Sequence, residues 1–221
     1  MGALGFELDH VFVAVRQGAP ELAALVRAGF DEGAPNVHAG QGTACRRVFV
    51  ENAYLEFLWL EDAIAALAPP VERTGLVERT RCLKGVSRLG VALRPSPGAN
   101  PEQRPQIRTW SYRPAYMPPG ASLSVAANAE ALYEPLLFFT PNAYRPGLHW
   151  VLHPNGARRM TGVQIELPAH SRPSPELTWL GTVPGVRLKF GEAELLTVEL
   201  DGGVQGQSAS LAPSAPVQVH W

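Results

Sequence analysis

The sequence predicts an α+β fold built from three successive β-rich modules, because one order of elements recurs along its 221 residues. A strand, a short helix and a hairpin follow one another, and this order begins near residues 6, 86 and 160. The segments AYLEFLWL (53–60) and AELLTVEL (193–200) resemble each other, and each carries a glutamate in mid-strand, Glu56 or Glu199. A repeat of roughly 70 to 80 residues is too long for a solenoid and suits duplicated βαββ units.

The first module is the clearest of the three. FELDHVFVAV (6–15) predicts a strand that is buried on both faces. In GAPELAALVRAGF (18–30), an early proline, an apolar stripe and a closing glycine predict a short amphipathic helix. RRVFVENAYLEFLWLE (46–61) predicts a hairpin, and EDAIAALAPP (61–70) predicts a brief helix that its two prolines end.

The other two modules follow the same order less regularly. VSRLGVALR (86–94) and PLLFFTP (135–141) predict strands, separated by proline-rich and aromatic segments that we expect to be irregular. RRMTGVQIELP (158–168) begins the third module, and SPELTWLG (174–181) predicts a short helix capped by its serine. The two apolar segments within residues 186–200 predict a second hairpin.

Composition excludes several classes of function. The chain has 19 basic and 20 acidic residues and no basic stripe, so neither a nucleic acid nor an anionic membrane is indicated as a partner. No apolar run approaches the roughly 18 residues of a membrane span, and the first ten residues do not resemble a signal peptide. Cys45 and Cys82 form no CxxC pair, which argues against a thiolate metal site. We expect a cytoplasmic protein.

Two polar residues stand at the centre of apolar strands. His10 lies between Leu8 and Phe12 on one strand face, and Glu56 lies in the middle of the second hairpin strand. A buried carboxylate is costly unless it is paired, hydrogen-bonded or bound to a metal. His10 and Glu56 could pair with each other or share a divalent cation. The alternative is a hydrogen-bonded core histidine and a carboxylate at a barrel mouth.

The glycine-rich loop HAGQGTACRR (38–47) is the second candidate region. Its glycines permit close approach of a ligand to the backbone, and Arg46 or Arg47 could clamp a carboxylate or a phosphate. The alternative is a polar surface turn with solvated arginines. Outside the loop, His149 and His153 share a face if their segment is a strand, and either could be a ligand.

The segments LDHVFVAV, HAGQGTACR and AYLEFLWLED resemble the glyoxalase-like domain family of the vicinal oxygen chelate superfamily. PLLFFTP and HPNGARRMTGVQIELP resemble later blocks of the same family, so the resemblance spans most of residues 6–168. It implies paired βαβββ modules, about 6–60 and 86–140, whose curved mixed sheets form a half-open barrel around a pocket. We expect residues 1–145 to form this domain and residues 146–221 to form a third, C-terminal β-rich module packed on it.

The resemblance also implies roles for single residues. In family members that use a metal, ligands come from the first and last strands of each module, and His10 and Glu56 match these positions. Both are therefore expected as metal ligands and catalytic residues, and His38, Thr43 and Arg46 as substrate-binding residues. An organic cofactor is not implied.

The later modules depart from the pattern of the family. Gly90 stands where the second module would place its counterpart of His10, and LLFF (136–139) supplies no carboxylate. Gln164 and Glu199 of the third module could complete a ligand set only if that module faced the first. These departures put catalysis by a bound metal in doubt.

Two functions therefore remain as hypotheses. The first is a lyase, isomerase or dioxygenase-type enzyme that acts on a small oxygenated metabolite with Zn, Ni, Mn or Fe. The second is a metal-free protein that binds a small molecule, as resistance-type relatives do, in a pocket lined by aromatic side chains. Those aromatic side chains would be Trp59, Trp110, Tyr112 and Tyr116. Pairing of modules across a homodimer is common in the superfamily.

Overall fold

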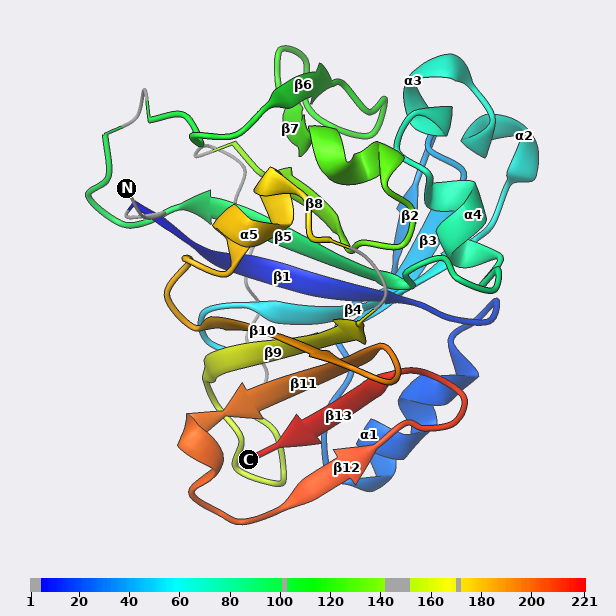
Figure 1. The fold of residues 1–221 in the computed structure, drawn as a ribbon. Helices are drawn as coiled ribbons and strands as arrows, with labels where there is room; N and C mark the ends of the chain where they lie inside the picture. The colour runs from blue at the N-terminus through cyan, green and yellow to red at the C-terminus, as the bar shows by residue number, and fades with distance from the viewer. Residues whose placement is uncertain (1–4, 101–102, 142–151, 170–171) are drawn as a thin grey trace.

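The computed structural model describes residues 5–100, 103–141, 152–169 and 172–221, which fold into two β-sheets (Figure 1). The larger sheet has eight strands in the order β2-β3-β4-β1-β5-β8-β7-β6. Its strands are β1 (Phe6–Ala14), β2 (Asn36–His38), β3 (Thr43–Phe49), β4 (Tyr54–Leu60), β5 (Leu89–Pro95), β6 (Thr109–Tyr112), β7 (Leu123–Ala126) and β8 (Leu136–Phe139). The fold is the α+β arrangement of curved mixed sheets that the sequence predicts.

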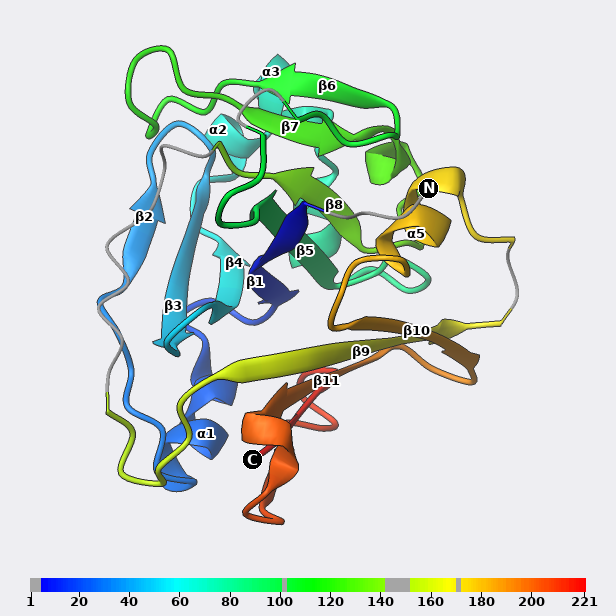
Figure 2. The same cartoon turned by 90° about the vertical axis from the view of Figure 1, so that its left-hand side faces the viewer.

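Strand β1 joins the first two modules at the centre of the larger sheet. It pairs in parallel with β4, where Phe12 lies opposite Glu56, and antiparallel with β5. The predicted hairpin is confirmed as β3 and β4, which pair antiparallel from Thr43 to Phe49. Seen from the side, the sheet curls from β2 and β3 through the central strands to β7 and β6 (Figure 2). This curl gives the sheet a concave face.

The two faces of the larger sheet have different partners. Alternate residues of β1, such as Val11 and Val13, and of β4, such as Leu55 and Phe57, belong to a core shared with the second sheet. The residues between them, including Phe12, belong to a separate apolar cluster on the other face. Because side chains alternate along a strand, the central strands are buried on both faces, as the apolar run predicts.

The second sheet has the order β10-β9-β11-β13-β12. Its strands are β9 (Met160–Pro168), β10 (Val186–Gly191), β11 (Leu195–Leu200), β12 (Ser208–Ser210) and β13 (Val217–His220). The predicted hairpin of β10 and β11 is wrong, because both strands pair with β9, β10 in parallel and β11 antiparallel. Helix α5 (Pro175–Leu180) carries the chain from β9 to its parallel neighbour, and the Ser174 side chain caps this helix by accepting from the Leu177 N–H. β10 thus becomes an edge strand, which explains its exposed residues.

The helices are short. The first of them lies beside β12 of the second sheet, and the helices that follow β4 lie at one end of the larger sheet (Figure 1). The predicted first helix is a 3-10 turn (Pro20–Leu22) followed by α1 (Ala23–Arg27). The Asp62 side chain caps α2 (Ala63–Ala66), and the two prolines that end α2 also begin α3 (Pro69–Glu72), which α4 (Leu76–Thr80) follows. The segment expected to be irregular contains β6, which pairs with β7. None of the described helices is long and apolar enough to span a membrane.

Gly90 in β5 lies opposite Phe12, and a Cβ atom added at Gly90 would overlap the Phe12 ring. Replacement of Gly90 with alanine is therefore expected to lower the free energy of unfolding by about 1–3 kcal/mol, because the buried ring cannot move without disturbing the core. Urea denaturation measures the change. Adding Phe12→Leu should restore part of the loss, whereas equal losses in the single and double variants would contradict the overlap.

Candidate functional site

The concave face of the larger sheet encloses a pocket of about 760 Å³, counting its opening to solvent. One side is mainly polar and is formed by β2, β3, β4 and the middle of β1. The opposite side is apolar and comes mainly from β7, β8 and the segment before β7. The polar side presents His10, Asn36, His38, Arg47 and Glu56, with Phe12 beside Glu56, and the apolar side presents Met117, Leu123, Val125, Leu136 and Phe138.

Two histidines and one glutamate converge on the polar side. His10 and Glu56 come from the neighbouring parallel strands β1 and β4, and His38 ends β2. The Nε2 atom of His10 lies 3.5 Å from one carboxylate oxygen of Glu56, and Nε2 of His38 lies 3.7 Å from the other. All three side chains are buried. One carboxylate therefore faces two imidazole rings, each through a different oxygen.

Asp9 holds the far side of the His10 ring. Consecutive side chains of a regular strand point to opposite faces, but the pairing of β1 with β5 is irregular at Asp9. His10 Nδ1 lies 2.7 Å from Asp9 Oδ2, and Arg94 donates to Asp9 Oδ1 at 3.0 Å. Burial opposes ionisation of Asp9, but its hydrogen bond to His10 and the charges of His10 and Arg94 outweigh burial and lower its pKa. The carboxylate thus orients His10 so that Nε2 faces Glu56.

A second hydrogen-bonded chain supports His38. Gln41 Nε2 donates to Thr43 Oγ1 at 2.8 Å, and this oxygen lies 2.9 Å from His38 Nδ1. The Tyr112 hydroxyl donates to Gln41 Oε1 at 3.1 Å. Burial lowers the pKa of His38 although Glu56 opposes the effect, so the ring is neutral at pH 7. When the Thr43 hydroxyl donates to Nδ1, the ring proton is on Nε2 and faces Glu56.

Cys45 contributes a sulfur atom next to this pair. Ligand atoms of His38, Cys45 and Glu56 all lie within 4.8 Å of one another. Burial raises the pKa of the Cys45 thiol, and the nearby Glu56 raises it further. Cys45 was not predicted as a ligand, because it belongs to no CxxC pattern. Its position two residues after Thr43, on the same face of β3, is the signal that would have found it.

Alternation along β3 separates the two adjacent arginines. Arg47 lies directly opposite Glu56 across β3 and β4, so both side chains are on the concave face. Arg46 forms an ion pair with Glu32 and donates to two backbone carbonyls, and it does not line the pocket. Thr43 is fully buried and contacts the pocket only through the histidine it supports. Of the expected substrate-binding residues, His38 therefore lines the pocket, and Arg47 lines it in place of Arg46.

The aromatic residues divide in the same way. Tyr112 and Tyr116 line the pocket. Trp59 belongs to the core on the opposite face of the sheet and donates from its indole nitrogen to Glu61 at 2.6 Å. Trp110 packs under the Arg73 guanidinium, 4.5 Å from the ring centroid, and does not line the pocket. The expectation for Trp59 is wrong because it lies an odd number of positions from Glu56 on β4, so it faces the other side of the sheet. The expectation for Trp110 is wrong because its ring lies against Arg73.

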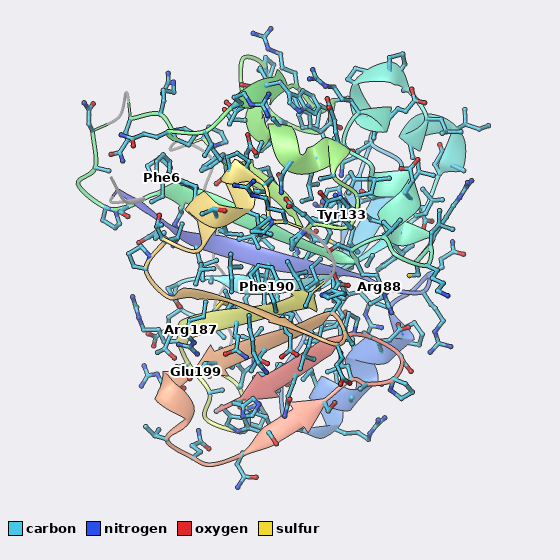
Figure 3. The ribbon with its side chains drawn as sticks, viewed as in Figure 1. Phe6, Arg88, Tyr133, Arg187, Phe190 and Glu199 are labelled. Carbon is cyan, nitrogen blue, oxygen red and sulfur yellow. The ribbon has the colours of Figure 1, made fainter. Side chains whose placement is uncertain are left out.

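Gln164 and Glu199 do not complete the ligand set. They lie on β9 and β11 of the second sheet, away from the concave face of the larger sheet. Glu199 forms an ion pair with Arg187 at 3.5 Å, and Figure 3 shows both side chains on this second sheet. The second sheet shares a core with the face of the larger sheet that is turned away from the pocket, so Gln164 and Glu199 cannot supply a ligand to the pocket.

His153 has a structural role. Its Nδ1 accepts a hydrogen bond from the Asp31 N–H at 3.0 Å, and its Nε2 lies 2.9 Å from the Phe49 carbonyl oxygen. Burial lowers its pKa, in accord with a neutral ring that donates to Phe49. Both nitrogens are therefore occupied, and His153 has none left for a metal. His149, the other candidate, lies outside the described residues.

The comparisons agree with this architecture. The family model of the glyoxalase-like domain matches residues 8–181. A hypothetical protein from Staphylococcus aureus has a similar structure over 97% of this chain and 99% of its own, with 11% identity and a TM-score of 0.60. This level of identity shows a shared fold alone.

Other solved structures match a smaller part of the chain. A methylmalonyl-CoA epimerase in complex with methylmalonyl-CoA and NH4+ matches 63% of this chain and 96% of its own, with 13% identity and a TM-score of 0.41. The Streptomyces coelicolor methylmalonyl-CoA epimerase matches 62% and 97%, with 13% identity and a TM-score of 0.40. No protein of curated function matches the sequence.

Proposed function

The chain belongs to the glyoxalase-like domain family of the vicinal oxygen chelate superfamily, and on this premise we propose that it is a metal-dependent enzyme acting on a small oxygenated metabolite. The observation that carries the proposal is the arrangement of His10, His38 and Glu56. Two imidazole nitrogens lie 3.5 and 3.7 Å from the two oxygens of one carboxylate, in the wall of a pocket. Two histidines and one carboxylate are a common ligand set for catalytic metals.

The surroundings of these residues support a divalent cation. A metal-binding histidine commonly gives its other ring nitrogen to a carboxylate or a neighbouring polar group. Asp9 occupies this position on His10, and Thr43 occupies it on His38. His38, Cys45 and Glu56 offer ligand atoms that all lie within 4.8 Å of one another, and His10, whose Nε2 lies 3.5 Å from Glu56, would be the further donor to the ion. Zn, Ni, Mn and Fe all accept imidazole and carboxylate ligands, and the bound ion would polarise substrate oxygens as a Lewis acid.

The side chains around the site suit proton transfer to and from a bound metabolite. Glu56 is a carboxylate at the pocket surface that could accept a proton from carbon or oxygen of the substrate. His38 would bind the ion through Nε2 and would carry no proton there, so Glu56 would also return the proton to the substrate. The hydrogen bond from Tyr112 to Gln41 continues this polar network, and an apolar wall lies on the other side of the pocket. A lyase or isomerase mechanism therefore fits the pocket, and a dioxygenase would need the same ligands with iron.

A metal-free binding protein is the second candidate, and the composition of the opposite wall supports it. The Phe12 ring fills the space beside Gly90, and Phe138 of β8 stands where a second-module ligand would be required. The ligands of the first module alone would be fewer than those of a site to which two modules contribute. In this case the pocket would sequester an apolar molecule without reaction.

Metal titration separates the two candidates. Chelator-treated protein is titrated with Zn²⁺, Mn²⁺, Ni²⁺ and Fe²⁺ by calorimetry, and the purified protein is analysed for its metal content. The enzyme hypothesis expects one ion per chain and release of protons on binding. Absence of binding to all four ions would leave the binding protein as the function.

A further inference from the structure

Arg47 places a positive charge at the edge of the catalytic pocket. It extends from β3 opposite Glu56, and its guanidinium lies 4.9 Å from the Phe49 ring centroid and 5.9 Å from that of Tyr54. The Tyr54 ring stacks on His10, with centroids 4.2 Å apart. The Tyr54 ring therefore contacts both the Arg47 guanidinium and the candidate metal ligand His10.

Arg47 forms no ion pair with a carboxylate in the described part of the chain, although Glu56 is its cross-strand neighbour. Its Nε and Nη2 atoms donate to the Ala34 carbonyl oxygen, at 3.3 and 2.9 Å. The neighbouring Arg46 is paired with Glu32, and Arg94 is paired with both Glu7 and Asp9. A guanidinium offers five N–H donors, so Arg47 keeps donors for a group that enters the pocket. It is the one arginine or lysine among the described residues lining this pocket.

The pocket also limits the number of charges that its ligand can carry. One guanidinium faces the space, and Glu56 already places a negative charge beside it. Without a metal, a carboxylate would match the single charge of the Arg47 guanidinium, whereas a doubly charged phosphate would leave one negative charge unmatched beside Glu56. The planar fork of arginine matches a carboxylate in two parallel hydrogen bonds.

The rest of the ligand must suit an apolar wall. Leu123, Val125, Leu136 and Phe138 of β7 and β8 line the pocket opposite the polar side, and Phe12 adds apolar surface beside Glu56. A hydrocarbon or aromatic body placed there removes apolar surface from water at about 25 cal/mol per Å². An acid without such a body would leave this wall wet and would gain little affinity.

We propose that the pocket takes an organic acid with one carboxylate and an apolar aliphatic or aromatic body, and that Arg47 binds the carboxylate. This substrate class rests on the proposed function for its reacting centre, which would lie between the carboxylate and the apolar body, near Glu56. Recognition of the acid by Arg47 does not require the metal. Arg47 is thus assigned as the residue that selects anionic substrates.

Binding of a matched series of probes to chelator-treated protein tests the assignment. Phenylacetate, phenylacetamide, acetate and phenyl phosphate are titrated by calorimetry against wild type, Arg47→Met and Arg46→Met. Phenylacetate is expected to bind wild type at least about tenfold more tightly than its neutral amide, since a charge-assisted bidentate pair is lost in the amide. Acetate and phenyl phosphate should bind more weakly than phenylacetate. Arg47→Met should remove the preference for the acid, and Arg46→Met should keep it.

The outcome of this test does not depend on whether the protein binds a metal. Equal affinity for the acid and the amide, an acid preference that survives in Arg47→Met, or no binding of phenylacetate at millimolar concentration would each overturn the assignment. Tighter binding of phenyl phosphate would show a phosphate site instead. If no metal binds but the acid preference depends on Arg47, the metal-dependent enzyme fails and the acid site stands. If metal binds and the acid preference is absent, the reverse holds.

Discussion

Replacement of Glu56 with glutamine is expected to lower the affinity of the protein for a divalent metal by about tenfold or more. Glutamine keeps the shape of the side chain but offers a neutral amide oxygen where the cation requires a carboxylate. Glu56 is the residue shared by both histidines, at 3.5 Å from His10 and 3.7 Å from His38. Calorimetric titration of the chelator-treated variant measures the loss. Its stability without metal should change little or rise, because a buried charge is removed.

The same variant tests the alternative in which Glu56 only pairs with a protonated His10. Removing the carboxylate would then leave a buried imidazolium without one partner, and the free energy of unfolding should fall by roughly 1–3 kcal/mol near pH 6. Because this alternative requires a protonated ring, the loss should shrink as the pH rises. Thermal melts at two pH values, with and without chelator, separate the outcomes. Glu72→Gln on exposed α3 is the charge control. A Glu56→Gln protein equal to wild type in every measurement would exclude both roles.

The centre of the site was visible in the sequence because it violates a pattern. A histidine or a carboxylate within a buried apolar strand must have a partner, and His10 and Glu56 are the polar residues at the centres of two such strands. The two side chains lie close together because β1 pairs with β4. The curved mixed sheet was predictable for the same reason, since apolar runs and turns mark its strands.

Where the pairing register of two strands decides which face of the sheet a side chain occupies, the sequence alone did not predict that face. Arg46 and Arg47 are adjacent and chemically identical, and only the pairing of Arg47 with Glu56 decides which one faces the pocket. The contact of Asp9 with His10 depends on an irregularity in the pairing of β1 with β5. The order of β10, β9 and β11 depends on the connection through α5, which places β10 parallel to β9 on one side and leaves β11 to pair on the other. Local patterns identify strands but do not determine which strands become neighbours.

Replacement of Asp9 with asparagine is expected to lower the free energy of unfolding by about 3 kcal/mol at pH 7, because it removes the shared partner of two buried groups. Asp9 is 4% exposed, and it contacts His10 at 2.7 Å and Arg94 at 3.0 Å. Glu7→Gln is the matched control: Glu7 pairs with the same arginine, but its side chain is 35% exposed, so we expect a loss below about 1 kcal/mol.

The pH dependence of the Asp9→Asn effect gives its cause. The pKa of Asp9 is lowered below its ordinary value of 3.8 in the folded protein, so its carboxylate contributes stability above that pH and loses the contribution as the pH falls through the folded pKa. Urea denaturation of wild type and Asp9→Asn should therefore give a constant difference near neutrality that narrows below about pH 4. Equal losses for Asp9→Asn and Glu7→Gln, or a difference that stays constant in acid, would mean that Asp9 stabilises the site through shape and not through charge. In the expected case, the ion pair that orients His10 also contributes to the stability of the fold, so the geometry of the site and the stability of β1 depend on the same carboxylate.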